Sequence, residues 1–408
     1  MTVDTTHRPD ARLDTVLQGL DQAEEYVVGI CFKTGPPGLL GVELEWTVHH
    51  LDDPSRPLHP ELLAQALRPH APATLDPESD HLPLPGGNVV TVEPGGQVEI
   101  STPPHASLAA LYSAVHADQA YLTEALARAG LRLGDRATDP YRRPRRLLRT
   151  PRYDAMADAF AAHGPHGQTM MCSTAAVQVC LDAGVPERVP ARWAALHALG
   201  PVLVALFANS AGSGSGWASE RMRAWLGLDP ARTAPVPTNG GGPARAWARY
   251  ALRAPVLGVN RDGRLHPGPP GLRFVDWIGG ALDRPPTGAD LEYHLGTLFP
   301  PVRPRGYVEV RYLDQQPPAE WHVPVAVLAA LFADETTVDA VRDRCAPVDG
   351  RWLDAARSGL ADPALSAAAR EVAALAVDRL AATGLAPEIR DEVTAAVHRR
   401  LATGGSTT

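Results

Sequence analysis

Polar and apolar residues alternate in four separate segments of this 408-residue chain. In the run GVELEW at 41–46, a strand would point Glu43 and Glu45 to one face and the large apolar side chains to the other. Two carboxylates on one face of a strand repel each other unless a cation lies between them. The run therefore predicts a strand whose polar face begins a cation site.

The second segment, VVTVEPGGQVEIS at 89–101, has two extended runs around a Pro-Gly-Gly turn. This arrangement predicts a β-hairpin or a sharp bend. Glu93 ends the first run, and Gln97 and Glu99 share one face of the second.

The segments MMCSTAAVQVCLD at 170–182 and GYVEVRYLD at 306–314 predict two further strands. Their polar faces carry Thr174, Gln178 and Asp182 in the first and Tyr307, Glu309 and Arg311 in the second. Each of the four segments thus combines one apolar face with one face of carboxylate, amide or arginine.

Helical spacing of apolar residues fills much of the remaining chain. The spacing predicts helices at 11–30, 61–67, 108–131 and 190–209, and an alanine-rich helical segment at 323–404 with breaks near Pro347 and Gly384. Residues 1–10 are expected to form a loose tail. Because no repeat or linker divides the sequence, we predict a single α+β domain over residues 1–408. Its C-terminal helices either pack on the sheet or form a small appendage.

Composition limits the kinds of partner. The net charge of −8 makes nucleic acid or an anionic membrane surface an unexpected main partner. No apolar run approaches the roughly 20 residues of a membrane span, and the N-terminus lacks the apolar core of a signal peptide. We therefore expect a cytoplasmic protein that binds neither membrane nor nucleic acid.

Lys33 is the only lysine among 38 basic residues. No glycine-rich run precedes it, so the chain has no P-loop, and any phosphate binding would depend on arginine and metal ions. Six arginines lie at 141–152, in a segment that is either a solvated loop or a cover over a phosphate-bearing ligand. The glycine–serine run at 211–217 is expected to be a flexible connection or a lid.

Side by side on one antiparallel sheet, the polar faces would form an acidic trough that contains an arginine. They contribute Glu43, Glu45, Glu93, Gln97, Glu99, Thr174, Gln178, Glu309 and Arg311. Hard oxygen ligands of this kind suit magnesium, which bridges protein carboxylates to substrate phosphates. A purely structural acidic face would explain the same pattern, because half-exposed strands are polar on one side. The residues alone leave both interpretations open.

Six strings occur in an order that resembles the glutamate–cysteine ligases of the plant and proteobacterial kind. They are GVELE, VEPGGQVEIS, MMCSTAAVQVCLD, ALFANS, RMRAW followed by DPAR, and YVEVR. The opening GPPGLLGVELEW and the chain length are closer to the actinobacterial branch, whose product feeds ergothioneine synthesis. The resemblance covers residues 24–320, and the remaining C-terminal segment adds no motif.

The resemblance implies a glutamine-synthetase-like catalytic domain, with a strongly curved antiparallel sheet, helices on its convex side and the active site on its concave face. The implied reaction joins the γ-carboxylate of L-glutamate to the amine of L-cysteine, with ATP and Mg²⁺, through a γ-glutamyl phosphate. Metal ions and arginine would cancel the repulsion between the anionic carboxylate and the triphosphate.

Positions in the shared strings imply roles for individual residues. The implied magnesium ligands are Glu43, Glu45, Glu93, Glu99 and Glu309. Gln97, Thr174, Gln178 and Asn209 would hold polar groups of the substrates. Arg221 and Arg311 would bind a substrate carboxylate or the migrating phosphoryl group, and Trp225 would wall the pocket of the amine acceptor.

Several alternatives stay open. Gln178, Asn209 and Trp225 would equally serve to satisfy or fill the fold. A ligase of the same fold that uses another amine fits the strings as well. A non-catalytic nucleotide-binding or scaffold protein is the third interpretation, although every piece of the acidic face is present. The plant-type proteins have a longer segment in place of the glycine–serine run, so the element that closes over the acceptor is not defined.

Overall fold

The structure, a computed structural model, describes residues 12–35, 38–212, 215–237, 242–261 and 264–403. The predicted tail at 1–10 therefore lies outside the described residues, and so do positions 213–214 of the glycine–serine run.

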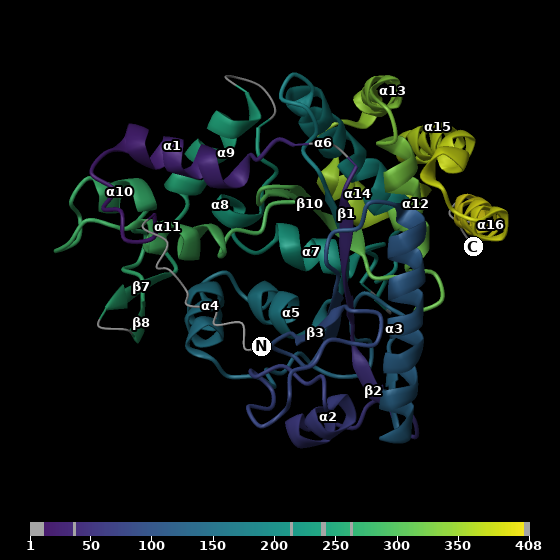
Figure 1. The fold of residues 1–408 in the computed structure, drawn as a ribbon, viewed down its shortest axis with the longest axis horizontal. Helices are drawn as coiled ribbons and strands as arrows, with labels where there is room; N and C mark the ends of the chain where they lie inside the picture. Colours follow the sequence, from purple (N-terminus) through teal and green to yellow (C-terminus); the bar gives the residue numbers. More distant parts are fainter. Residues whose placement is uncertain (1–11, 36–37, 213–214, 238–241, 262–263, 404–408) are drawn as a thin grey trace, which may run out of the picture.

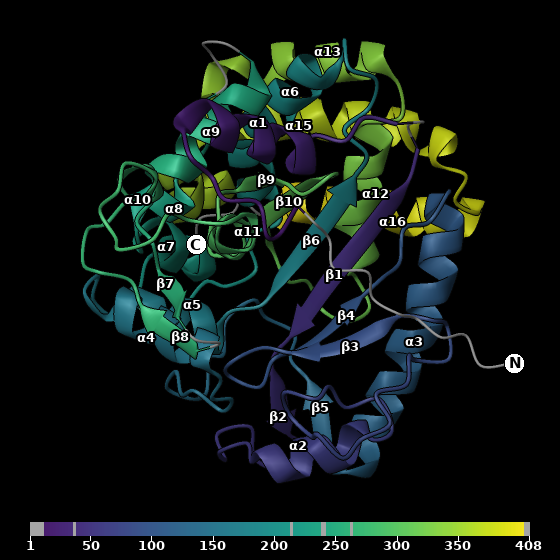
Figure 2. The same ribbon diagram turned by 60° about the vertical axis from the view of Figure 1, so that its left-hand side comes forward.

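A six-stranded antiparallel sheet in the order β3-β4-β1-β6-β10-β9 runs through the molecule (Figures 1 and 2). Its strands are β1 (Leu40–Trp46), β3 (Val89–Val92), β4 (Val98–Ser101), β6 (Ala176–Leu181), β9 (Val302–Pro304) and β10 (Val308–Asp314). Two small ribbons pair β2 (Val48–His50) with β5 (Leu131–Leu133) and β7 (Gly258–Arg261) with β8 (Arg264–Pro267). The α+β class and the antiparallel sheet are confirmed, and all four polar-faced segments contribute to this one sheet.

Strand register brings the predicted carboxylates together. Glu45 of β1 lies directly opposite Glu99 of β4, and Glu43 lies opposite Gln178 of β6. Side chains directly opposite one another in an antiparallel pair have Cβ atoms only about 5 Å apart. At the other end of the sheet, Glu309 of β10 lies opposite Arg303 of β9.

Sixteen α-helices are present in the described residues. They are α1 (Leu20–Cys31), α2 (Pro60–Leu67), α3 (Leu108–Arg128), α4 (Pro151–Ala161), α5 (His166–Ser173), α6 (Val189–Leu206), α7 (Glu220–Leu226), α8 (Pro230–Thr233), α9 (Pro243–Arg253), α10 (Phe274–Ile278), α11 (Gly288–Leu295), α12 (His322–Leu331), α13 (Glu335–Cys345), α14 (Trp352–Ser358), α15 (Pro363–Arg379) and α16 (Pro387–Thr403).

Helices cover both faces of the sheet. In Figure 1, where β1 is seen nearly edge-on, α3, α12, α15 and α16 lie on one side, and α4, α5 and α7 lie on the other. Helix α3 contacts β1, α12 contacts β6, and α6 contacts β10. The C-terminal helices α13, α14 and α15 pack on α6.

Helix α6 is the one described helix that is long and apolar enough to cross a membrane. Its position gives another reason for that composition. Of its 18 residues, 83% are buried inside the protein, under the C-terminal helices and against β10. An apolar helix with this burial is a core helix.

The prediction of one strand across 170–182 is wrong in its first part. Residues up to Ser173 belong to α5, and the hydroxyl of Thr174 ends this helix by donating to the carbonyl of Met170 at 2.7 Å. The MMCS run has no β-branched residue, and methionine is a good helix former. The first helix is also shorter than predicted and begins at Leu20.

Candidate active site

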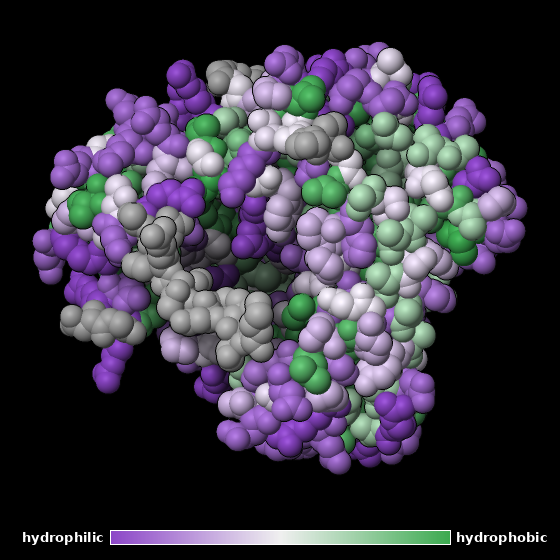
Figure 3. Space-filling model, in the orientation of Figure 1, coloured by the Kyte–Doolittle hydropathy of each residue, from purple (hydrophilic) through white to green (hydrophobic). Residues whose placement is uncertain are grey.

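The polar faces of the strands form the floor of a cavity of about 330 Å³. The sheet side contributes Glu43, Glu45, Glu93, Gln97, Glu99, Gln178 and Arg311, with Arg303 and Arg305 at and beyond β9. The opposite side comes from helices and their termini, and contributes Arg152, Tyr153, Met156, Met170, Met171, Thr174, Trp225, Gly296 and Phe299. In Figure 3 the surface is hollowed over the place where β10 and α7 lie in Figure 1, and hydrophilic residues gather there.

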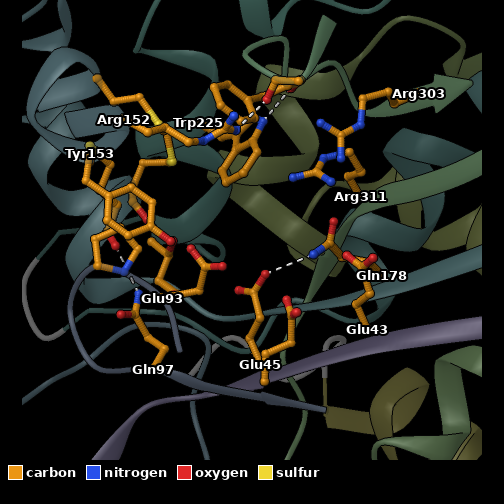
Figure 4. Close-up of a pocket in the computed structure, with 18 of the residues that line it drawn as sticks. Glu43, Glu45, Glu93, Gln97, Arg152, Tyr153, Gln178, Trp225, Arg303 and Arg311 are labelled. Atoms are coloured by element: carbon orange, nitrogen blue, oxygen red, sulfur yellow. Dashed lines mark hydrogen bonds between the residues drawn. The ribbon is translucent and has the colours of Figure 1, made fainter. Parts of the chain in front are cut away.

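Two of the floor glutamates are held by fixed donors. The backbone N–H of Ala176 and the amide of Gln178 donate to the two carboxylate oxygens of Glu45, each at 2.9 Å (Figure 4). The hydroxyls of Thr91 and Ser101 both donate to Oε1 of Glu99, at 2.5 and 2.7 Å. These contacts orient the carboxylates into the cavity and leave Oε2 of Glu99 without a donor among the described residues.

The floor holds more negative charge than its buried surroundings can stabilise. Burial, with repulsion from Glu93, raises the pKa of Glu45 to about 8. Burial and the neighbouring carboxylates likewise raise the pKa values of Glu93 and Glu99 to about 8. The pKa of Glu43 is also raised, by burial and then by Glu309. Carboxyl groups whose pKa values are raised by burial and mutual repulsion form a set of oxygen ligands from which a divalent cation would displace protons.

Glu309, which was predicted as a fifth metal ligand, has a different environment. Its fully buried carboxylate forms ion pairs with Arg303 at 2.6 Å and with Arg311 at 2.9 Å. Although burial alone would raise the pKa of Glu309, these two guanidinium groups lower it to about 2. Glu309 does not line the cavity, and its charge balances the two arginines that do.

Two other predicted site residues also lie behind the cavity wall. The amide of Asn209 donates to the backbone oxygens of Asp135 and Gln315 at 2.8 and 2.7 Å. Arg221 is buried, donates to the backbone oxygen of Arg311 at 2.7 Å, and lies 4.9 Å over the ring of Trp225. Both residues therefore position β10 and Trp225, and neither is among the residues that line the cavity.

The other predicted residues reach the cavity. Gln97 donates to the backbone oxygen of Thr174 at 2.8 Å, and its own amide oxygen is buried without a donor. The amide oxygen of Gln178 is likewise buried without a donor. Trp225 donates its indole N–H to the backbone oxygen of Phe299 at 2.8 Å, so only its ring faces the cavity.

The sequence analysis did not assign Arg303, Arg305 or the three methionines of the helix side to the site, and it offered Arg152 only as part of a six-arginine segment. Arg152 ends the six-arginine segment, and its contribution to the cavity agrees with a cover over an anionic ligand. Arg303 and Arg305 precede the turn before the YVEVR string. Their alternation was a usable signal, but only the pairing of β9 with β10 shows that Arg303 lies opposite Glu309.

Comparison with known families identifies the family of this chain. The model of the family "Glutamate-cysteine ligase family 2 (GCS2)" matches residues 39–408, and the chain belongs to this family. The match includes the C-terminal helices, where the sequence alone offered no motif.

Two relatives are bacterial and one is from a plant. The chain is 42% identical to the glutamate–cysteine ligase EgtA of Mycolicibacterium smegmatis, over 88% of this chain and 84% of the relative. It is 42% identical to the protein of the same name from Mycobacterium tuberculosis, over 90% and 85% of the two chains. The chloroplastic glutamate–cysteine ligase of Brassica juncea is 30% identical, over 67% of this chain and 55% of the relative. A solved glutamate–cysteine ligase from Francisella tularensis in complex with AMP superposes with a TM-score of 0.48 at 13% identity, over 92% of this chain and 83% of that one.

Proposed function

We propose that this chain is a glutamate–cysteine ligase, which uses ATP and Mg²⁺ to join the γ-carboxylate of L-glutamate to the amine of L-cysteine. The observation that carries the proposal is the single cavity in which four carboxylates of raised pKa face a group of arginines. The similarity to two EgtA proteins favours ergothioneine synthesis as the destination of the γ-glutamylcysteine. The need for ATP and a reduced thiol favours the cytoplasm.

The donor set of the floor fits Mg²⁺. Glu43, Glu45, Glu93 and Glu99 offer only carboxylate oxygens, which are the hard ligands that this ion prefers. Glu43 and Glu93 have no hydrogen-bond donor among the described residues, so their oxygens are available. When bound, Mg²⁺ would neutralise the triphosphate and the glutamate carboxylate enough for the two anions to approach.

The arginines supply positive charge at fixed positions. Arg303 and Arg311 are anchored by Glu309, so their guanidinium groups are already ordered before an anion binds. Arg152 donates to the backbone oxygen of Gly296 at 2.6 Å and extends this rim on the helix side. We assign these three residues, with Arg305, to the substrate carboxylates and the transferred phosphoryl group.

The reaction requires two displacements. A γ-carboxylate oxygen of glutamate attacks the γ-phosphorus of ATP, and ADP leaves with the electrons of the broken bond. The amine nitrogen of cysteine then attacks the acyl carbon, phosphate leaves, and the amine loses a proton. We assign the buried amide oxygens of Gln97 and Gln178 to accept hydrogen bonds from substrate nitrogen, since neither has another donor among the described residues.

Phosphate release with glutamate, ATP and Mg²⁺ tests this proposal, in the presence and absence of cysteine, with γ-glutamylcysteine identified by mass spectrometry. We expect cysteine to stimulate release and Glu99→Gln to abolish it. The matched control is Glu124→Gln, which removes a carboxylate from an exposed ion pair with Arg128 on α3. Stimulation by another amine but not by cysteine would move the assignment to a different amine acceptor.

A further inference from the structure

Three of the five methionines in the sequence lie on one wall of the active-site cavity. Met156 belongs to α4, and Met170 and Met171 belong to α5, two helices that pack against each other. All three methionines are buried, and only 4–7% of the surface of each residue is exposed. Such a concentration of thioethers, opposite a floor of carboxylates, has no role in binding metal or phosphate.

The same side of the cavity contributes two aromatic rings, together with the polar groups of Arg152 and Tyr153. Trp225 and Phe299 are in edge contact, with ring centroids 6.1 Å apart. The indole N–H is already donated to the backbone of Phe299, so these two rings and the three thioethers offer no strong hydrogen bond. Arg152 lies one helical turn before Met156, so a cationic and an apolar group follow each other along one face of α4.

We propose that Met156, Met170 and Met171 recognise the side chain of the amino-acid acceptor and select a thiol. This inference rests on the proposed ligase function and adds the basis of its specificity. A thiol loses little hydration when it enters an apolar pocket, whereas a hydroxyl without a partner costs several kcal/mol in an alkane-like environment. Where only the thioethers and the two rings surround it, a serine hydroxyl would lose its water contacts, so we expect serine to be a poorer acceptor than cysteine. Methionine sulfur is polarizable and its side chain adapts in shape, which favours sulfur over a methyl group of similar size.

The test compares three acceptors that differ at one atom, namely cysteine, 2-aminobutyrate and serine. The values of kcat/KM are measured for the wild type and for Met156→Leu and Met170→Leu. Leucine keeps the apolar character, the approximate volume and the helix propensity, so the variants are expected to fold. Met222→Leu is the control, because Met222 is a buried methionine on α7 that does not line the cavity.

We expect the ratio of kcat/KM for cysteine to that for 2-aminobutyrate to fall about two- to tenfold in each wall variant, as expected for the loss of sulfur contacts. The value for 2-aminobutyrate should stay close to that of the wild type, and the control should keep the wild-type ratio. An equal loss with both acceptors, or an unchanged ratio, would mean that the methionines only pack the wall. A wild type that no acceptor stimulates would instead overturn the ligase function together with this inference.

Discussion

Replacing Glu309 by glutamine removes the one negative charge that two buried arginines share. Arg303 and Arg311 are 6% and 8% exposed, and both contact the same carboxylate oxygen, at 2.6 and 2.9 Å. The amide keeps the shape of the side chain, so the change tests charge rather than packing. We expect a large loss of stability.

The magnitude follows from the pKa. Arg303 and Arg311 overcome the opposing effect of burial and lower the Glu309 pKa from an ordinary value of 4.5 to about 2. A change of this size corresponds to about 3 kcal/mol in favour of the ionised folded state. Removal of one partner from a buried ion pair typically costs about 3–5 kcal/mol, which agrees. Because the folded pKa is the lower one, this stabilisation is complete above about pH 4.5 and is lost as the pH falls towards 2.

Urea unfolding followed by tryptophan fluorescence measures the loss, at pH 7 in EDTA. We expect Glu309→Gln to lower the free energy of unfolding by about 3 kcal/mol. Glu124→Gln should change it by less than about 1 kcal/mol, since both partners of that pair are more than half exposed. If Glu309 were mainly a metal ligand, its loss would remove a repelling carboxylate, and stability in EDTA would stay the same or rise. That result would refute the assignment of Glu309 to the arginines.

Three further changes test the floor of the site. In EDTA, the free energy of unfolding of the wild type should fall as the pH rises from 7 through 8. The reason is that folded Glu45, Glu93 and Glu99 hold protons that the unfolded chain has released. Urea titrations at several pH values measure this fall, and Mg²⁺ should make the free energy of unfolding depend less on pH. Burial lowers the pKa of His294 to about 3, so below about pH 6.5 buried histidines of this kind make the free energy of unfolding rise with pH. The range above pH 7 therefore reports on the glutamates. Glu99→Gln should raise the free energy of unfolding in EDTA at pH 8 by about 1 kcal/mol or more. The same change should lower Mg²⁺-dependent phosphate release at least about 100-fold. Unchanged values in both assays would contradict a metal-binding floor. Gly95→Ala should lower both activity and the melting temperature, because a Cβ atom there would lie 2.1 Å from the backbone oxygen of Cys172, whereas Gly19→Ala meets nothing within 4 Å and should retain activity.

The strands and their polar faces could be predicted because alternation is a local property of the sequence. The acidic floor itself depends on the order of strands in the sheet. Glu45 faces Glu99 only because β1 pairs with β4, a strand that follows it by more than 50 positions. The shared strings placed both residues in one site without showing this contact.

The helix side of the cavity shows where local patterns fail. The MMCS run was predicted as part of the following strand, although its two methionines reach the cavity from α5. Met156 gave no signal, because an apolar residue on an amphipathic helix is expected to be core. Asn209 and Arg221 lie in shared strings, but Asn209 donates to backbone oxygens and Arg221 contacts the Arg311 backbone and the ring of Trp225 from behind the wall. A string of residues that accompanies a site does not distinguish a group that touches substrate from one that positions a strand.

Charge balance supports the proposal that this site binds metal ions in addition to its arginines. The floor has Glu43, Glu45, Glu93 and Glu99, and the cationic rim has Arg152, Arg303, Arg305 and Arg311. Glu309 behind the wall already offsets part of that rim, so the fully ionised cavity is negative before any substrate enters. In the proposed reaction, ATP and the glutamate carboxylates would add several further negative charges to this cavity. More arginine at the floor would form ion pairs with the glutamates, as Arg303 does with Glu309, and would leave no open oxygen. A divalent cation carries two charges on one atom and binds carboxylate and phosphate oxygens together, so it meets both requirements.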